Sequence, residues 1–283
     1  MHLKIEHTLS YHYSPPVTLD MQNIRLKPRP DTRQQVLKFN LDIMPSPSFI
    51  THHTDTENNP VTTAWFNGSQ EELRIIASSE VITENRNPYD FIITEPELNH
   101  LPLEYREPSR TLLDLYTTNQ KEINQILSDF LKPILVQAKY ETVTFLSELV
   151  TYISKTFKKA DRKYGNPWSP EKTLREGRGA CRDLAWLYIV SCRSLGLAAR
   201  FVSGYYLPFN PRKKPELHAW CEVFLPGAGW IGFDPDLGIT VSERHVAIAT
   251  SYDHTLTLPI SGTFWGKGTK LNLKTSIVMR SLE

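Results

Sequence analysis

The first eighty or so residues alternate apolar and polar side chains with a period of two. This pattern is clear over LKIEHTLSYHY (residues 3–13) and VLKFNLDIM (36–44), and it continues in ELRIIASSEVIT (72–83). Such alternation predicts strands with one face buried, because successive side chains of a strand point to opposite faces. Asn67-Gly68 is a strong signal for a tight turn between two of them. Many short strands separated by turns indicate an all-β sandwich or small barrel.

The pattern changes over residues 88–110, which hold four prolines and little periodicity. A proline-rich segment of this kind is typical of a boundary. We therefore expect a β-rich N-terminal domain over residues 1–97 and a second domain over residues 98–283. Within the second, apolar residues recur at helical spacing over 123–131, ending at Pro133, and again over 143–157.

A third, longer helix is predicted from about Cys181 to Leu195, ending at Gly196. The stretches ARFVSGYY (199–206), HAWCEVFL (218–225), GWIGFDPD (229–236) and TKLNLKTSIVM (269–279) then read as strands. The short PGAG segment between the second and third of them predicts a hairpin. Helices followed by a meander of strands favour an α+β fold, with helices packed on an antiparallel sheet.

Composition narrows the class of protein. The 283 residues carry 32 basic and 31 acidic side chains, a net charge of +1, so there is no basic excess of the kind that accompanies nucleic-acid binding. No stretch has the apolar length of a membrane helix or of a secretory signal. Three cysteines do not form a disulfide framework. These features predict a cytoplasmic protein that binds neither nucleic acid nor membrane, and they leave its oligomeric state open.

Cys181 is the cysteine best placed for chemistry. It follows Gly177, Gly179 and Ala180 and begins the predicted helix, where unpaired backbone amides and the helix dipole stabilise a thiolate. The small residues before it leave room for a substrate carbonyl, and its own amide is placed to bind an oxyanion. The alternative is a structural cysteine, since free cysteine is among the most buried residue types.

The other two cysteines fit a core. Cys192 lies about 16 Å further along the helix, too far for a disulfide with Cys181 and beyond the reach of the helix dipole. Cys221 shares its strand face with apolar Ala219 and Val223, opposite to the face of His218.

A thiol nucleophile needs a base, and the base needs a group that orients it. His218 begins the first strand of the predicted hairpin, and Asp234 ends the second. With the turn inside Pro226–Gly229, the two residues fall opposite or diagonal to each other on one face. Asp234 then holds one imidazole nitrogen and leaves the other for Cys181. Each residue alone has a simpler explanation, a loop-capping histidine or a turn aspartate; the conjunction favours acyl-transfer chemistry.

The remaining histidines offer no metal site. His52 and His53 lie in a polar, turn-like segment, and His245 and His254 have no cysteine or carboxylate at ligand spacing. We therefore expect no metal and no cofactor.

Three stretches carry a resemblance to a known family: GACRDLAWLYIVSCRSLGLAARFVSGYY, HAWCEVFLPGAGWIGFDPDLG and ISGTFWGKG. They resemble, in this order, the core of the bacterial transglutaminase-like superfamily, and the β-rich N-terminal region resembles the domain that precedes this core in many members. The resemblance implies a papain-like cysteine-proteinase core and a Cys-His-Asp triad, which by position is Cys181, His218 and Asp234. Arg182 departs from the glutamine that members often carry after the cysteine.

The function expected from these observations is thiol-dependent acyl transfer on a peptide or protein amide, with water as the favoured acceptor. The resemblance favours a cysteine peptidase or amidase, while an amine acceptor would make the protein a transglutaminase. A peptide-binding module without catalysis is the alternative from another class. Trp168, Tyr206 and Trp220 are the aromatic residues that could line a substrate cleft, although aromatic residues at such positions are more often core.

Overall fold

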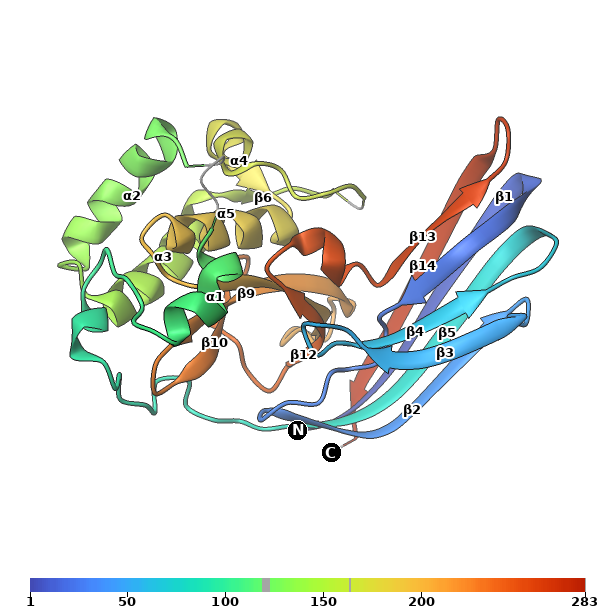
Figure 1. Ribbon diagram of the computed structural model, residues 1–283, viewed down its shortest axis with the longest axis horizontal. Helices are drawn as coiled ribbons and strands as arrows, with labels where there is room; N and C mark the ends of the chain where they lie inside the picture. The colour runs from blue at the N-terminus through green and yellow to red at the C-terminus, as the bar shows by residue number, and fades with distance from the viewer. Residues whose placement is uncertain (119–122, 163, 283) are drawn as a thin grey trace.

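The protein is described by a computed structural model over residues 1–118, 123–162 and 164–282. It consists of a long, curled β-sheet beside a mixed body in which helices cover a second sheet (Figure 1). The two chain termini lie close together at one end of the curled sheet (Figure 1), where Leu3 pairs with Ser281. No helix among the described residues is long and apolar enough to cross a bilayer.

The curled sheet has seven antiparallel strands in the order β2-β5-β1-β4-β3, with β13 and β14 also paired to β1. Its strands are β1 (His2–Ile24), β2 (Gln34–Met44), β3 (Phe49–Thr54), β4 (Pro60–Trp65), β5 (Ser69–Thr83), β13 (Ile260–Trp265) and β14 (Lys270–Ser281). The alternation read from the sequence is visible in the burial of β1, since Leu3, Ile5, Leu9 and Tyr13 are buried. The N-terminal β region is thus one curled sheet.

The last two strands require a correction of the division at residue 98. The sequence-based division assigned all of 98–283 to the second domain, yet β13 and β14 pair with β1 of the curled sheet. An alternating strand shows which of its faces is buried but not which strand it pairs with. The chain therefore returns to its first strand after completing the mixed body.

The mixed body contains a five-stranded antiparallel sheet in the order β11-β10-β9-β8-β12. These strands are β8 (Ala199–Tyr206), β9 (Glu216–Leu225), β10 (Gly229–Asp234), β11 (Ile239–Thr240) and β12 (His245–Ser251). The hairpin predicted around the PGAG segment is confirmed as β9 and β10. A two-stranded parallel pair, β6 (Lys158–Lys159) and β7 (Arg178–Gly179), precedes the central helix.

The helices are α1 (Ser109–Thr117), α2 (Gln125–Gln137), α3 (Thr142–Thr156), α4 (Pro170–Glu176) and α5 (Cys181–Arg193), with short 3-10 turns η1 (Pro96–Asn99) and η2 (His254–Thr257). α2 continues through Pro133, where the sequence predicted its end. The predicted α5 is confirmed to within two residues of its expected end. Its inner face is packed on the sheet, where Tyr188 stacks on Phe233 with ring centroids 5.6 Å apart.

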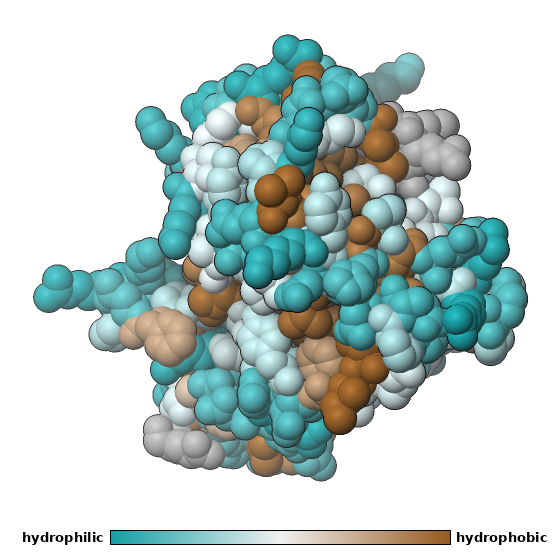
Figure 2. All heavy atoms as spheres, turned by 90° about the vertical axis from the view of Figure 1, so that its left-hand side faces the viewer, coloured by the Kyte–Doolittle hydropathy of each residue, from teal (hydrophilic) through white to brown (hydrophobic). Residues whose placement is uncertain are grey.

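The helical side of the molecule is mostly polar on its surface, with apolar side chains interspersed (Figure 2). Val136 of α2 and Tyr152 of α3 are among the exposed apolar residues. The core between the helices and the five-stranded sheet is continuous, from Leu98 in η1 to Phe233 in β10. The α+β class and the papain-like arrangement of a helix on an antiparallel sheet are confirmed.

Candidate active site

The first turn of α5 is fixed by Asp183, a residue that sequence reasoning missed. Its Oδ2 accepts a hydrogen bond from the Ala180 amide at 2.8 Å, which caps the helix immediately before Cys181. Gly179 is required here because a Cβ at this position would lie 2.9 Å from the Cβ of Asp183. A carboxylate three residues after a helix start is a capping signal that the sequence offered.

Asp183 also ties the preceding loop to the helix. Its fully buried carboxylate accepts bonds from the Arg162 guanidinium, at 2.7 and 3.2 Å, and from the Trp168 amide at 2.8 Å. Two cations lie over the Trp168 ring, with Arg162 at 4.4 Å and Lys172 at 4.5 Å from its centroid. The buried charge is therefore fully hydrogen-bonded, and it holds the Trp168 loop beside the start of α5.

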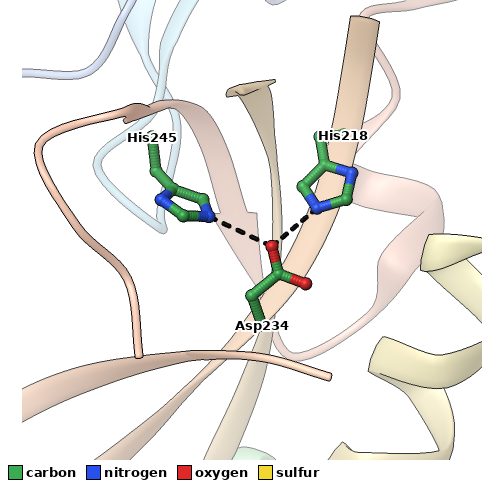
Figure 3. A group of neighbouring side chains, drawn as sticks. All are labelled: His218, Asp234 and His245. Atoms are coloured by element: carbon green, nitrogen blue, oxygen red, sulfur yellow. Dashed lines mark hydrogen bonds and ion pairs between the residues drawn. The ribbon is translucent and has the colours of Figure 1, made fainter. Parts of the chain in front are cut away.

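Asp234 and His218 meet through the hairpin. Phe233 lies opposite Cys221 in the β9–β10 register, so continuing the ladder places Asp234 diagonal to His218. Asp234 Oδ2 and His218 Nε2 are 2.7 Å apart (Figure 3). Because an ionised carboxylate only accepts, Nε2 carries a hydrogen and donates it.

The carboxylate of Asp234 is completely satisfied although it is fully buried. Oδ1 accepts from the backbone amides of Asp236 and Leu237 at 3.0 and 3.1 Å, in the turn after β10. Oδ2 accepts from two histidines. Burial acts to raise the pKa of Asp234, but the charge and hydrogen bonds of His218, together with His245, outweigh it and hold the pKa well below its ordinary value. Asp234 is an anion with a fixed orientation.

Cys181, at the first position of α5, is the third residue near His218. It is partly exposed, whereas the imidazole is buried. His218 Nδ1 has no partner at regular hydrogen-bond geometry. Burial acts to lower the pKa of His218, but Asp234 and then Cys181 raise the pKa well above its ordinary value. Cys181 is therefore near enough to interact with the ring. A long thiol–imidazole contact is common before substrate binds. Cys181, His218 and Asp234 are thus brought together.

His245 is the second residue that sequence reasoning missed. It was set aside because no cysteine or carboxylate stands at ligand spacing from it in the sequence, but the fold places its Nε2 3.0 Å from Asp234 Oδ2 (Figure 3). It begins β12, where it lies opposite Tyr206 in the sheet. No local pattern marks this histidine, because its partner is set by strand pairing alone.

Among the described residues, one group of side chains has the composition and spacing to hold a metal ion, and it consists of His218, Asp234 and His245. Their ligand atoms all lie within 4.8 Å of one another, and all three residues are buried. In this arrangement both histidine Nε2 atoms are already directed at the one oxygen, Asp234 Oδ2 (Figure 3). The donor set therefore forms a hydrogen-bonded cluster centred on a carboxylate oxygen.

The other two cysteines lie in the core, as predicted. Cys192 and Cys221 are both fully buried, and burial raises the pKa of each thiol well above its ordinary value. The Cys221 thiol donates to the Phe233 carbonyl at 3.1 Å. Neither is placed for nucleophilic chemistry.

The three aromatic residues suggested for the cleft differ in their exposure. Trp168 is partly exposed beside α5, whereas Tyr206 and Trp220 are buried, with 7% and 1% of their surface accessible. The Trp220 ring passes over Gly204, where a Cβ would lie 2.4 Å from it. Tyr206 and Trp220 both contact the rings of His218 and His245. Because Trp220 is almost completely buried, it does not fit the role of a substrate contact. Strand alternation predicts the face on which Trp220 lies but not which residues cover that face.

Comparison with solved structures agrees with the fold. A protein from Cytophaga hutchinsonii that is proposed to be a cysteine protease superposes with a TM-score of 0.74 at 20% identity, covering 100% of this chain and 91% of that one. The same two-part architecture therefore extends over the whole chain. At this level of identity the likeness concerns the fold.

Sequence relatives extend over nearly the full length as well. An uncharacterised protein from Mycobacterium leprae is 26% identical over 274 residues, covering 94% of each chain. One from Mycobacterium tuberculosis is 26% identical over 278 residues, covering 93% of this chain and 87% of the relative.

The fold and the arrangement around Cys181 define a protein with a papain-like core. Residues 129–235 match the transglutaminase-like superfamily, and residues 3–82 match the bacterial transglutaminase-like N-terminal region. The chain thus carries a match to the core of the transglutaminase-like superfamily, preceded by a match to the bacterial transglutaminase-like N-terminal region.

Proposed function

We propose that this protein is a thiol-dependent acyl-transfer enzyme that acts on amide bonds of a peptide or protein. The observation that carries the proposal is the position of the His218 ring: one nitrogen lies 2.7 Å from the buried carboxylate of Asp234, and Cys181, at the start of a helix, lies near enough to raise the pKa of the same ring. Such an arrangement is that of a nucleophile, a base and the group that orients the base.

In the proposed reaction, Cys181 sulfur attacks the amide carbonyl and forms a thioester, and the C–N bond breaks. His218 holds the proton that comes from the thiol and gives it to the leaving amine. Asp234 stays ionised and supports the imidazolium. The amide of Cys181, at the first position of α5, has no partner within the helix and is placed to bind the oxyanion.

Hydrolysis is the favoured second step: water attacks the thioester, His218 accepts its proton, and the acid and free thiol are released. An amine in place of water makes the same intermediate into a transglutaminase product. A glutamine peptide offered with and without a primary amine separates the two outcomes. Free acid in excess supports hydrolysis, and an amine adduct in excess replaces it with transfer.

The first test is alkylation of the thiols with iodoacetamide across pH. The proposal expects Cys181 to react at pH 6 far faster than an ordinary thiol, and the buried Cys192 and Cys221 to stay unlabelled in the folded protein. Cys181→Ala removes the label and the amide-cleaving activity together, since triad members act as a unit. A Cys181 that reacts no faster than a free thiol peptide excludes an activated nucleophile and leaves a peptide-binding role.

A reducing compartment suits this chemistry, because it keeps the Cys181 thiol free. We therefore keep the cytoplasm as the proposed location. Cell fractionation followed by immunodetection tests it, and recovery of the protein in a periplasmic or extracellular fraction would exclude it.

A further inference from the structure

One oxygen atom of Asp234 accepts hydrogen bonds from two histidines. Oδ2 lies 2.7 Å from His218 Nε2 and 3.0 Å from His245 Nε2, and the two rings approach it from opposite sides (Figure 3). The triad accounts for the first of these contacts and leaves the second unexplained. His245 has no exposed side-chain surface, so the contact is not incidental surface chemistry.

The tautomer of His245 follows from its other nitrogen. The Ser242 backbone amide donates to His245 Nδ1 at 3.2 Å, so Nδ1 is an acceptor and carries no hydrogen. The hydrogen of a neutral ring is then on Nε2, where it points to Asp234 Oδ2. Protonation of Nδ1 would set two N–H groups against each other. His245 is thereby held as a neutral donor to the carboxylate.

The ring itself packs against two aromatic rings. Its centroid lies 4.8 Å from the Tyr206 ring and 5.2 Å from the Trp220 ring, the latter edge-on. Burial lowers the pKa of His245, in keeping with a neutral ring. Two turn amides fix Oδ1 of Asp234, and His245 fixes Oδ2, so the carboxylate plane cannot rotate without losing a buried hydrogen bond.

We propose that His245 is a positioning residue of the acyl-transfer site: as a neutral Nε2–H donor it holds the Asp234 carboxylate in the orientation that binds the imidazolium of His218. This inference rests on the proposed function. It assigns His245 no contact with substrate and no proton transfer. Without its donated bond, Asp234 Oδ2 is free to turn from His218, and the thiolate–imidazolium pair loses its support.

Matched substitutions separate this role from packing. His245→Gln places an amide N–H near the position of Nε2 and restores a donor to Asp234. His245→Asn places its amide near Nδ1 and faces Ser242 instead. His245→Phe keeps an aromatic ring against Tyr206 and Trp220 but donates no hydrogen bond. His254→Phe is the control, because His254 packs edge-on against Trp186 outside the cluster.

The readout is the rate of Cys181 alkylation by iodoacetamide at pH 6, with thermal unfolding measured in parallel. We expect His245→Phe and His245→Asn to slow alkylation by about tenfold or more, the weight of a hydrogen bond to a charged group, while His245→Gln and His254→Phe keep nearly the wild-type rate. If His245→Phe does not fold, the comparison of Gln with Asn decides alone.

Two failures can be told apart. A wild-type Cys181 with ordinary thiol reactivity overturns the proposed function itself. A reactive wild-type thiol whose alkylation is unchanged in the Asn variant, or is slowed equally in the Gln and Asn variants, overturns only the role of His245.

Discussion

His218 on β9 binds Asp234 on β10 across a diagonal of the hairpin. Their Nε2 and Oδ2 atoms are 2.7 Å apart. Continuing the strand register places Trp220 directly opposite Asp234, and the buried Trp220 ring contacts the rings of both His218 and His245. The bond occupies Nε2 and leaves Nδ1 of the imidazole free for a second partner. The strands thus fix the base and its carboxylate, and α5 brings the thiol to them.

Replacing Asp234 with Asn tests the orienting carboxylate. We expect the proposed amide-cleaving activity to fall by about three to four orders of magnitude, as in other triads, because the amide cannot support an imidazolium. Steady-state kinetics measure this loss, and near-ultraviolet circular dichroism checks that the packing of aromatic rings such as Tyr206 and Trp220 beside the histidines is kept. Glu171→Gln is a control, since Glu171 forms an exposed pair with Arg175 on α4. A loss below about tenfold would remove Asp234 from the mechanism.

The alkaline limit of activity is expected to lie well above pH 6.5. The active pair needs protonated His218, whose pKa Asp234 and Cys181 raise against the effect of burial, so kcat/KM falls only as pH rises through that raised value. In Asp234→Asn the limit moves to lower pH. A pH profile of kcat/KM for both proteins measures the shift. An alkaline limit near 6.5 in the wild type contradicts the support of His218 by these two groups.

Replacing Asp183 with Asn should destabilise the protein by about 3–5 kcal/mol, the cost of breaking a buried ion pair. Its carboxylate is fully buried and accepts bonds from Arg162, Ala180 and Trp168. Urea unfolding gives the free energy, and removal of the exposed Arg175–Glu171 pair by Arg175→Gln should cost under about 1 kcal/mol. Equal costs for the two substitutions would argue against a capping and loop-holding role for Asp183.

The buried histidine between the two sheets makes stability depend on acid. His7 of β1 lies within hydrogen-bond distance of Tyr205 and Thr275, and burial lowers its pKa to about 4. The unfolded chain takes up a proton near pH 6.5, but the folded chain does so only near the lower pKa. Stability present above pH 6.5 is therefore lost as pH falls, by up to about 3 kcal/mol at pH 4.

Comparison with His7→Gln isolates this contribution, since glutamine keeps hydrogen-bonding groups and does not titrate. Urea unfolding at pH 7, 5.5 and 4 should show a shallower acid dependence in the variant by about the stated amount. Parallel curves for the two proteins would show that His7 is not the titrating group.

The sequence by itself predicted several strands of both sheets, the helix α5 and the three central residues of the candidate site. It did not predict α1 or β12, and it placed His52 and His53 in a turn although they lie in strand β3. Alternation over β1 and β9 and the helical spacing of α5 follow from which faces are buried, and such periodicity is local. His218 and Asp234 belong to one hairpin, whose turn length sets their register, so their proximity also follows from local sequence. Cys181 was recognisable from its place at a helix start.

Only the tertiary structure shows which distant segments of the chain lie in contact. It pairs β14, at the end of the chain, with β1 at its start. It also places His245 of β12 within hydrogen-bond distance of Asp234, and Arg162 within hydrogen-bond distance of Asp183. It also buried Trp220 while leaving Trp168 partly exposed. Periodicity specifies a face but not its partner, because strand pairing and helix docking are selected by the free energy of the complete core.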